Sequence, residues 1–331
     1  MPRFDVTLAG EMNLDLILYG LPEDLPPERE LLATGIVTTL GGSSANVAHN
    51  LAAFGSTVGF QSCIGTDELG QIALGQLAGS GVDISRVRQI DGAIKSSLTV
   101  VLQRVGWRTM LTYAGTIEEL RGDELDFDYL ADTRHFHLSS YYLQKGLQSH
   151  VPELFRKLKK AGVTISLDTN DDPEDCWHGV RDLLQYVDVF LPNEREAQRL
   201  AGVNDIAEAG KRLAELVPVV VLKIGSQGAV AHRGAERIVC PGIQVKTIDA
   251  VGAGDSFDAG FLHAYVSGAD LRTCLEHGNA AGALSTTCPG GTEAFRDRES
   301  VERFISERGV KLHANARKPS HNGTQAAVGL R

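Results

Sequence analysis

The sequence lacks features that several large classes of protein require. Its five cysteines are scattered and none forms a C-x-x-C pair, which argues against a disulfide framework and against a structural zinc site. No run approaches the roughly 20 apolar residues that a membrane-spanning helix needs. The N-terminus carries acidic residues early and has no basic flank before a long apolar run, so we predict no signal peptide. Together these absences predict a soluble protein of the cytoplasm.

Positive charge is also scarce. The 331 residues include 32 Lys and Arg against 42 Asp and Glu, which gives a formal net charge of −10. No cluster of basic residues stands out, whereas nucleic-acid binders present a basic face. We therefore expect no nucleic acid among the partners. Hydrophobic residues make up 43% of the chain, which is ordinary for a globular protein long enough to bury a sizeable core.

Three ion-binding and nucleotide-binding motifs are missing as well. The P-loop pattern G-x-x-x-x-G-K-[ST] does not occur. The Rossmann pattern needs a third glycine where Phe257 follows Gly252 and Gly254. The acidic stretch 168–176 places Pro173 where an EF-hand loop requires glycine. Any phosphate chemistry must therefore use another arrangement of residues.

What the sequence does contain is an alternation of short apolar runs with helical patterns. This alternation predicts an α/β fold, with a doubly wound, mostly parallel sheet flanked by helices. The ligands of such sheets bind beyond the carboxyl ends of the strands. We predict strands over 4–10, 57–65, 135–139, 164–168, 187–193 and 219–225, and helices over 43–55 and 67–81.

A predicted hairpin breaks this alternation. Residues 96–104 and 108–115 look like two strands joined by a short turn, and the segment 11–40 is also strand-like near its end. We expect these parts, drawn from about 11–40 and 92–116, to form a small β-sheet beside the main sheet. A sheet placed over a strand-end site would act as a lid.

No linker or internal repeat divides the chain. We therefore predict a single domain over residues 1–308. Residues 309–331 are polar and weakly patterned, and we interpret them as a C-terminal extension.

The segment 249–261, DAVGAGDSFDAGF, places Gly252, Ala253 and Gly254 directly before an apolar helical run. Small residues at a helix N-terminus let successive backbone N–H groups point toward one anion. Asp255 then has two interpretations, as a helix cap or as a base beside a phosphate. The segment alone does not decide between them.

Two further segments have both a chemical and a structural interpretation. In LGGSSANVA (40–48), Asn46 falls in the first turn of a helix, where its amide could face a polyol, but Gly-Gly-Ser is also an ordinary capped loop. In LPNEREA (191–197), Asn193 and Glu196 share one face of a helix start. They could organise a hydrated Mg²⁺, or they could form a capping box.

Together these segments match a family. GGSSANVAHNLAAFG and DAVGAGDSFDAGF, in this order, closely resemble the two signatures of the ribokinase-like (PfkB) carbohydrate kinases. The segments NERE, LKIGSQG (222–228) and GEMNLDLI (10–17) resemble that family too, and the resemblance covers roughly residues 4–305. It implies a ribokinase-like fold and an ATP-dependent kinase that phosphorylates a primary hydroxyl of a small sugar.

The resemblance also implies roles for particular residues. Asp255 is expected to be the general base, and the backbone N–H groups of Gly252, Ala253 and Gly254 the anion hole. On the acceptor side, four residues match the positions that bind sugar hydroxyls, namely Asn13, Asp15, Gly42 and Asn46.

On the nucleotide side, the residues implied to lie beside ATP are Lys223, Gly225, Gly228 and Asn279. Lys223 departs from the small hydroxyl residue often found at its position. Asn193 and Glu196 are expected to position Mg²⁺ through water. Asp249 matches a position that, with carbonyls around 286–291, supports a monovalent cation such as K⁺ in some members, and a capped turn remains the alternative.

The acceptor stays open at this point. A nucleoside kinase on the same scaffold is the alternative to a sugar kinase, and aromatic residues that could stack on a base are Trp107, Tyr113, Tyr141 and Tyr142. A phosphorylated acceptor would need a nearby cation, for which Lys95, Arg104 and Arg108 are candidates. The lid could also pair with the lid of a second copy to form a homodimer.

Overall fold

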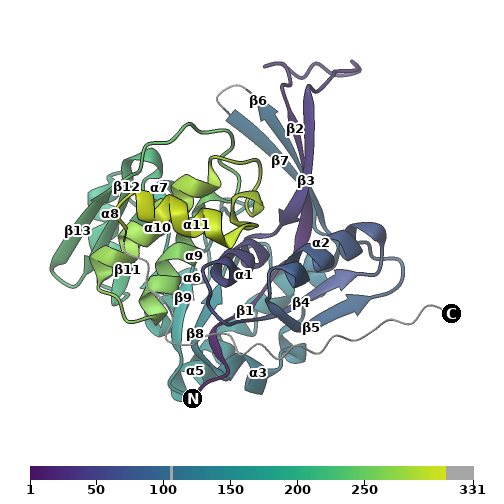
Figure 1. Ribbon diagram of the computed structural model, residues 1–331. Coiled ribbons are helices and arrows are strands. Elements are labelled where there is room, and N and C mark those ends of the chain that lie inside the picture. The colour runs from purple at the N-terminus through teal and green to yellow at the C-terminus, as the bar shows by residue number, and fades with distance from the viewer. Residues whose placement is uncertain (105–106, 311–331) are drawn as a thin grey trace.

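The predicted parallel sheet is confirmed in the computed structural model, which describes residues 1–104 and 107–310 (Figure 1). Most neighbouring strands of the described sheet pair in parallel. At one edge, the last two strands, Gly228–Arg233 and Glu236–Pro241, each pair antiparallel with the strand before them. The order is β13 (Glu236–Pro241), β12 (Gly228–Arg233), β11 (Val219–Lys223), β10 (Val189–Phe190), β9 (Thr164–Leu167), β8 (Thr133–Leu138), β1 (Phe4–Ala9), β4 (Val58–Gly65) and β5 (Asp83–Ile90).

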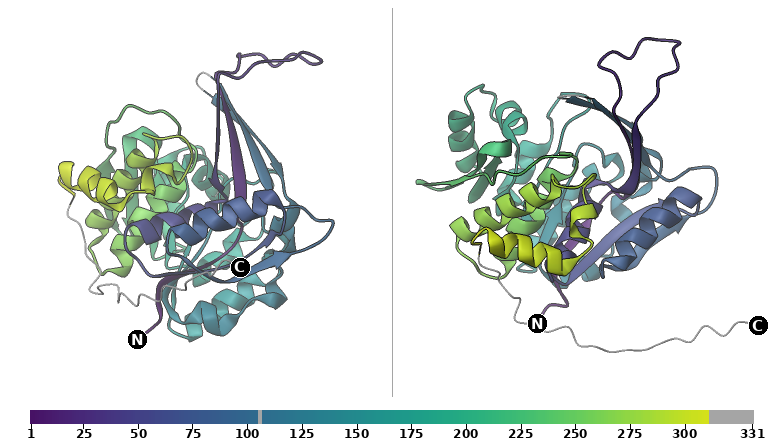
Figure 2. Two further views of the ribbon diagram at one scale, coloured as in Figure 1. Left: turned by 45° about the vertical axis from the view of Figure 1, so that its right-hand side comes forward. Right: turned by 45° about the horizontal axis from the view of Figure 1, so that its top comes forward.

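Helices cover both faces of this sheet, as Figures 1 and 2 show. One face carries α1 (Ser43–Ala53), α2 (Glu68–Gly79), α9 (Ala253–Val266), α10 (Leu271–Ser285) and α11 (Arg298–Glu307). The other carries α3 (Phe127–Ala131), α4 (Lys145–Gln148), α5 (Val151–Lys160), α6 (Val180–Leu183), α7 (Glu194–Ala201) and α8 (Ile206–Ala214).

Each face of the sheet has its own apolar core. Successive strand side chains point to opposite faces, so Leu8 of β1 enters one core while the next residue, Ala9, enters the other. A parallel strand is therefore apolar on both sides. This burial explains why the strand segments appear in the sequence as short continuous apolar runs rather than as alternating ones.

The strand order reverses beside β1. The chain builds outward from β1 through β4 to β5, then returns to the other side of β1 with β8 and continues to β11. In open α/β sheets, such a reversal opens a crevice at the carboxyl ends of the strands. Ser139 follows β8 there and Asp168 follows β9, so polar side chains gather at this edge.

The predicted lid is a second, four-stranded sheet. Its order is β3 (Gly35–Gly41), β2 (Asn13–Tyr19), β6 (Leu98–Arg104) and β7 (Trp107–Tyr113). The expected hairpin is the antiparallel pair β6–β7, whereas β2 and β6 are parallel. The sheet projects from the body of the molecule in all three views (Figures 1 and 2).

One predicted strand is much shorter than expected. The run 187–193 contributes only Val189–Phe190 to the ladder. Pro192 has no N–H to donate, and Asn193 already begins α7 as its N-cap. The predicted C-terminal extension falls, from residue 311 onward, outside the described residues.

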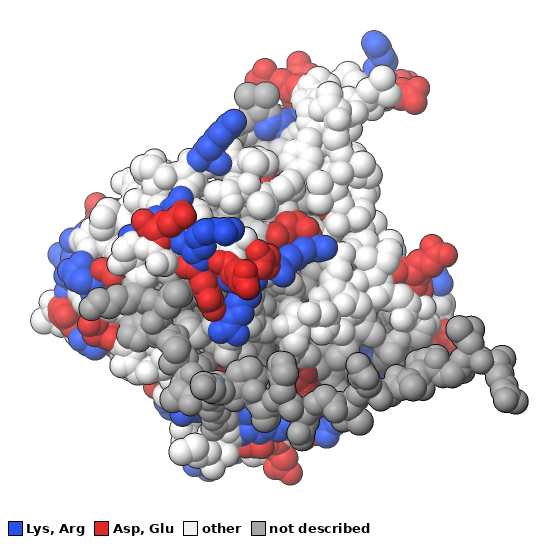
Figure 3. Space-filling model, in the orientation of Figure 1, with Lys and Arg blue, Asp and Glu red and all other residues white. Residues whose placement is uncertain are grey.

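The structure also shows how apolar the described helices are and how charged side chains are distributed over one face. No described helix combines the length and the apolar character that crossing a membrane requires. On the face drawn in Figure 3, basic and acidic side chains are intermixed rather than separated into areas of one sign.

Candidate active site

A cleft of about 1250 Å³ lies at the carboxyl ends of the parallel strands. The lid contributes Thr99 and Thr112 to its lining, and the large sheet contributes Asp168. Most of the predicted site residues line this cleft: Asn13, Asp15, Gly42, Asn46, Asn193, Glu196, Lys223, Gly225 and residues 252–255. Within the described parts of the chain, Gly228, Asn279 and Asp249 are not among the lining residues.

Helix α9 begins at the glycine-rich segment, as predicted. Gly252 is its N-cap, with φ 70° and ψ 8°, and a Cβ there would lie 2.4 Å from Gly291 Cα. Only glycine suits a position that is both left-handed and this crowded. Among the described residues no side chain caps the helix, and the N–H of Ala253 makes only a long 3.4 Å bond to Ala250 O. The positive end of the helix dipole therefore faces the cleft, which is the geometry of an anion site.

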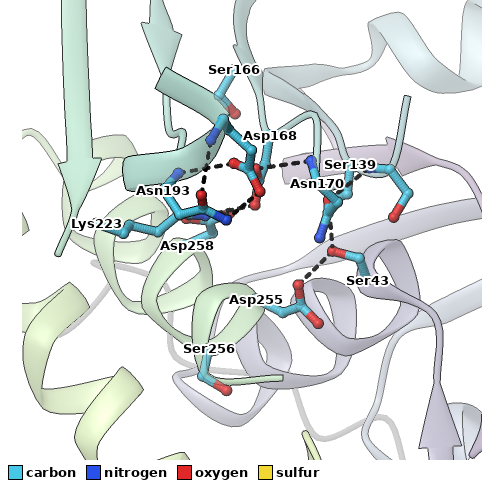
Figure 4. Close-up of polar contacts among 12 residues, drawn as sticks. Ser43, Ser139, Ser166, Asp168, Asn170, Asn193, Lys223, Asp255, Ser256 and Asp258 are labelled. Carbon is cyan, nitrogen blue, oxygen red and sulfur yellow. Dashed lines mark hydrogen bonds and ion pairs between the residues drawn. The ribbon is translucent and has the colours of Figure 1, made fainter. Parts of the chain in front are cut away.

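Asp255 is the third residue of α9, and the helix-cap interpretation of it is wrong. Its carboxylate accepts a hydrogen bond from Ser43 Oγ at 2.5 Å (Figure 4). It also accepts one from Asn46 Nδ2 at 2.9 Å, and it makes no capping bond to its own helix. Burial raises the pKa of Asp255 above its ordinary value, and the bonds from Ser43 and Asn46 oppose that rise. The two family-like segments thus meet at this one carboxylate.

Helix α1 also begins without a side-chain cap from the described residues. Its N-cap is Gly42, with φ 88°, and a Cβ there would lie 2.9 Å from both Asn13 Oδ1 and Glu11 O. The glycine therefore lets β2 pass close to the helix start. One turn on, Asn46 holds Asp255 with its amide nitrogen, while its buried Oδ1 has no hydrogen-bond partner in the described chain.

Asn13 and Asp15 lie on one face of β2, a strand of the lid. Asn13 Nδ2 donates to Asp15 Oδ1 at 2.9 Å and to Thr99 Oγ1 at 3.2 Å. Burial, together with the charges of Asp255 and Asp249, raises the pKa of Asp15 to about 7, although the hydrogen bond from Asn13 opposes this rise. This carboxyl is therefore poised between its two protonation states near neutral pH.

Sequence reasoning missed a buried ionic cluster next to Asp255. Lys223 ends β11, and its Nζ lies 2.6 Å from Asp168 Oδ2 and 3.3 Å from Asp258 Oδ2 (Figure 4). Burial lowers the pKa of Lys223, but the charges of Asp168 and Asp258 outweigh burial and raise it overall. Asp258 follows Asp255 at i+3, so helical spacing would have placed both on one face.

A second missed contact connects the sheet to Ser43. Asn170 Oδ1 accepts from Ser140 N at 2.9 Å and lies 3.3 Å from Ser43 Oγ. Asn170 stands at φ 52° just beyond β9. The sequence places Asn170 only near a strand end and gives no sign that it reaches Ser43.

The capping-box interpretation of Asn193 and Glu196 is confirmed. Asn193 Oδ1 accepts from Glu196 N at 3.0 Å, and Glu196 Oε2 accepts from Asn193 N at 2.8 Å. Both residues also line the cleft. Burial and the nearby charge of Asp168 raise the pKa of Glu196 to about 8, while the charge of Lys223 opposes this. The same pair therefore builds the start of α7 and presents a buried carboxylate to the cleft.

The residues predicted for the nucleotide side separate into two groups. Lys223 and Gly225 line the cleft. Gly228 and Asn279 instead lie against the end of β13. Asn279 Nδ2 donates to Cys240 O and Pro241 O at 3.1 Å, and a Cβ on Gly228 would lie 2.2 Å from Cys240 O.

Asp249 is buried at a turn before α9. Its oxygens accept hydrogen bonds from Val251 N at 3.0 Å, Gly290 N at 3.1 Å and Tyr19 OH at 2.8 Å. Both carboxylate oxygens are thus engaged by donors of the protein, which is the pattern of the capped-turn alternative.

Comparison with known proteins finds similar sequences and similar folds. The sequence model that describes the pfkB family of carbohydrate kinases matches residues 3–298 of this chain. The chain is 31% identical to an ATP-dependent ribose-1-phosphate kinase of Halopiger xanaduensis, over 92% of this chain and 98% of that protein. It is 29% identical to a 2-dehydro-3-deoxygluconokinase of Bacillus subtilis, over 89% and 96%. A structure of Arabidopsis thaliana ribokinase complexed with ribose and ATP superposes with a TM-score of 0.77 at 26% identity, covering 91% and 98%.

Proposed function

Because the chain belongs to the pfkB family of carbohydrate kinases, we propose that it transfers the γ-phosphoryl group of ATP to a primary hydroxyl of a small sugar. The observation that carries this proposal is the start of α9. A carboxylate and an uncapped helix terminus face one cleft, and the carboxylate is held by Ser43 and Asn46 instead of by its own helix. Those two features are a base and an anion site placed side by side.

In the proposed reaction, Asp255 removes the proton from the acceptor hydroxyl as the oxygen attacks the γ-phosphorus. The bond between the γ-phosphorus and its bridging oxygen breaks, and the electron pair leaves on the β-phosphate of ADP. The backbone N–H groups of Gly252, Ala253 and Gly254 stabilise the charge on the transferred phosphoryl group. Gly254 has no side chain and lies beside Lys223 Nζ, so it leaves room for the phosphates at the start of α9.

The acceptor is proposed to bind between β2 and the start of α1. Asn13, Asp15 and Asn46 present amide and carboxyl groups there, and the unpartnered Asn46 Oδ1 can accept from a hydroxyl. A second buried group without a described partner is the Tyr142 hydroxyl, which also lines the cleft. Buried polar atoms are normally hydrogen-bonded, so two such atoms in one cleft support a ligand with several hydroxyls.

The aromatic residues favour this acceptor over a nucleoside. Of the candidates for stacking on a base, only Tyr142 is among the described residues that line the cleft. Trp107 instead lies under Arg104, whose guanidinium carbon is 3.2 Å from the centroid of the Trp107 ring. Of the cationic candidates, Arg108 is in the lining, which leaves a phosphorylated sugar within the proposed class.

The residues of the cleft are compatible with Mg²⁺ as a hydrated ion. No group of three or more His, Cys, Asp or Glu suited to a metal occurs in the described part of the chain, and Mg²⁺ commonly keeps its waters and binds substrate phosphates. Glu196, with Asn193 beside it, is the carboxyl group that would hold such waters, because both residues line the cleft together with Asp168. The ion would neutralise the phosphates of ATP.

Residues Lys223 and Gly225 are proposed to contact the phosphates, and Gly228 and Asn279 to shape the nucleotide side from the β13 edge. The hydrogen bonds to Asp249 do not fit a K⁺ ligand well, so no step here depends on a monovalent cation. Comparing rates in K⁺ with rates in a bulky organic cation at equal ionic strength tests the remaining hypothesis. Equal rates would remove the K⁺ site.

A homodimer through the lid is proposed from the exposed apolar side chains of β3 and β7. Ile36, Leu111 and Tyr113 are 63%, 56% and 54% exposed, and apolar side chains gathered on one sheet commonly mark an interface. Light scattering at micromolar concentration tests this, and a monomer would contradict it. We place the enzyme in the cytoplasm, where its free cysteines would stay reduced.

The decisive experiment is a coupled ADP-release screen with hexoses, pentoses, sugar acids, sugar phosphates and nucleosides as acceptors. We expect turnover with a sugar or sugar derivative and none with nucleosides. Turnover with nucleosides alone would establish the alternative. Binding of a sugar without ADP release across the whole panel would show a sugar-binding protein without kinase activity.

A further inference from the structure

Lys223 is the last residue of β11, and its side chain lies beside the first turn of α9. Its side chain is only 11% exposed, yet it lines the cleft beside residues 252–255. A Cβ placed on Gly254 would lie 3.6 Å from Lys223 Nζ, so the ammonium stands in ordinary contact distance of the proposed anion hole. Its position is fixed from the main chain as well, since Lys223 N donates to Pro192 O at 3.0 Å.

Two carboxyls hold this ammonium in place. Asp168 is 2% exposed and Asp258 is fully buried. Burial raises the pKa of Asp258 well above its ordinary value, and its hydrogen bond to Asp168 raises it further. Burial also acts on Asp168, but the charge of Lys223 and the bond from Asp258 lower its pKa overall. The two shifts have opposite directions, so Asp168 is the carboxyl whose ionised form is favoured beside the ammonium.

An ammonium has three N–H donors. Nζ lies 2.6 Å from Asp168 Oδ2 and 3.3 Å from both carboxyl oxygens of Asp258. The two 3.3 Å contacts are long and go to one carboxyl, so a phosphate oxygen that enters beside Gly254 can take over one of these donors. A buried, preorganised cation of this kind stabilises developing negative charge without having to reorganise.

We propose that Lys223 donates a hydrogen bond to the γ-phosphoryl group of ATP during its transfer, with Asp168 and Asp258 as the residues that position it. Lys223 keeps its proton throughout: Asp255 takes the acceptor proton, and the bridging oxygen leaves with its electron pair on ADP. This inference rests on the proposed function and deepens it, because it separates a contact to the transferred group from general binding of the nucleotide.

A purely structural ion pair would behave differently. Loss of a structural pair would lower stability and weaken all ligands alike. Loss of a contact to the γ-phosphoryl group would weaken binding only of nucleotides that carry that group. The ratio of affinities for the ATP analogue AMP-PNP and for ADP, both with Mg²⁺, therefore distinguishes the two roles even if no acceptor is known.

The variants are Lys223→Met and the double variant Lys223→Met with Asp168→Asn. The double variant removes the ammonium together with its partner at 2.6 Å and so keeps a folding variant available. The matched control is Lys159→Met, which removes another lysine–aspartate pair, at 2.7 Å to Asp188 and away from the cleft. Calorimetric titrations of the full chain with Mg·AMP-PNP and Mg·ADP give the affinities, and thermal unfolding gives the stability.

We expect both Lys223 variants to bind AMP-PNP about 10- to 100-fold more weakly, the range for a charged hydrogen bond, with little change for ADP. With an acceptor identified, kcat should fall about 10²- to 10³-fold. Lys159→Met should change only stability, and Lys223→Arg should restore part of the AMP-PNP preference.

An unchanged AMP-PNP to ADP ratio in the double variant would overturn the role of Lys223. A wild-type chain that prefers AMP-PNP through Lys223 but phosphorylates no acceptor would support this contact and overturn the proposed function. A wild-type chain that binds neither nucleotide would overturn both.

Discussion

Two groups of helix starts in this molecule use the same residue types for different ends. Away from the cleft, α2, α8 and α10 each begin with an aspartate whose carboxylate caps its own backbone, namely Asp67, Asp205 and Asp270. At the cleft, α1 and α9 begin with a glycine, and no described side chain caps them. The nearby aspartate of α9, Asp255, binds Ser43 and Asn46 instead.

The difference teaches where a helix terminus remains available for a ligand. A capped helix start has its N–H groups satisfied and contributes stability of about 1 kcal/mol. An uncapped start leaves those groups for a bound anion and gives up that stabilisation. We call the starts of α1 and α9 at the cleft the inner starts, and those of α2, α8 and α10 the outer starts. The following predictions test whether the inner starts contribute to function and the outer starts only to stability.

The largest effect is expected at Asp255. Asp255→Asn keeps the size of the side chain and its place between Ser43 and Asn46, but it removes the base. We expect kcat to fall about 10²- to 10⁴-fold, with ATP binding retained in a calorimetric titration. A variant that kept more than about a third of the wild-type kcat would refute the role of Asp255 as the general base.

The pH dependence of the reaction should reflect the same carboxylate. A base must be ionised, and burial raises the pKa of Asp255 above its ordinary value. Activity is therefore lost as the pH falls through this raised pKa, about tenfold for each pH unit below it. A profile of kcat against pH measures this. If the residual activity of Asp255→Asn kept the same acid limb, the limb would belong to another group, such as Asp15.

Blocking the inner helix start should reduce activity without unfolding the chain. A Cβ on Gly254 would lie at ordinary contact distance, 3.6 Å from Lys223 Nζ, so Gly254→Ala fits but places a methyl group in the anion hole. We expect kcat to fall roughly 10- to 100-fold, somewhat less than the loss of a whole donor. The control is Gly75→Ala in α2, where a Cβ meets nothing within 4 Å; it should add about 0.5–1 kcal/mol of stability and leave kcat unchanged.

A selective effect on the acceptor is expected at Asp15. Asp15→Ala removes a buried carboxyl that faces the sugar side of the cleft, so KM for the sugar should rise roughly 10- to 100-fold, as for the loss of a charged hydrogen bond. KM for ATP should barely change, since Asp15 belongs to β2 of the lid and is not among the residues proposed to contact ATP. Steady-state kinetics with each substrate varied in turn measure both values. An equal rise in the two would place Asp15 outside acceptor binding.

The smallest effect is expected at an outer helix start. Asp67 accepts from Gly70 N at 3.0 Å and Ser96 N at 2.7 Å. Asp67→Ala should lower the free energy of unfolding by about 1 kcal/mol, or roughly 2–4 °C in Tm. The kinetic constants should not change. A large loss of kcat with unaltered Tm would remove the distinction between inner and outer helix starts.

Much of the fold was predictable because it rests on local patterns. The helices predicted over 43–55 and 67–81 and the lid hairpin are confirmed within a few residues. The strand over 187–193 was too long in the prediction because apolar residues continue past the point where Pro192 and the cap Asn193 end the ladder. An apolar run shows that a segment is buried, but it does not show how far the segment pairs.

The residues of the site also divide into those that a local motif predicts and those that only the fold brings together. Asp255, Asp15 and the glycines stood out because motifs place them in short stretches of sequence. Lys223, Asp168 and Asp258 form one ionic cluster across 90 positions of the chain numbering, from 168 to 258. Nothing in a local pattern indicates that three such charges share one buried space.

The sequence was enough to find the alternation of strands and helices, the glycines at two helix starts and the carboxylate three residues into one of them. These follow from backbone preferences and from hydrophobic periodicity, which act over a few residues. That Asp255 is not a cap follows instead from long-range packing. Ser43 and Asn46 lie more than 200 positions away in the chain, and packing α1 against α9 offers the carboxylate these donors in place of its own helix backbone.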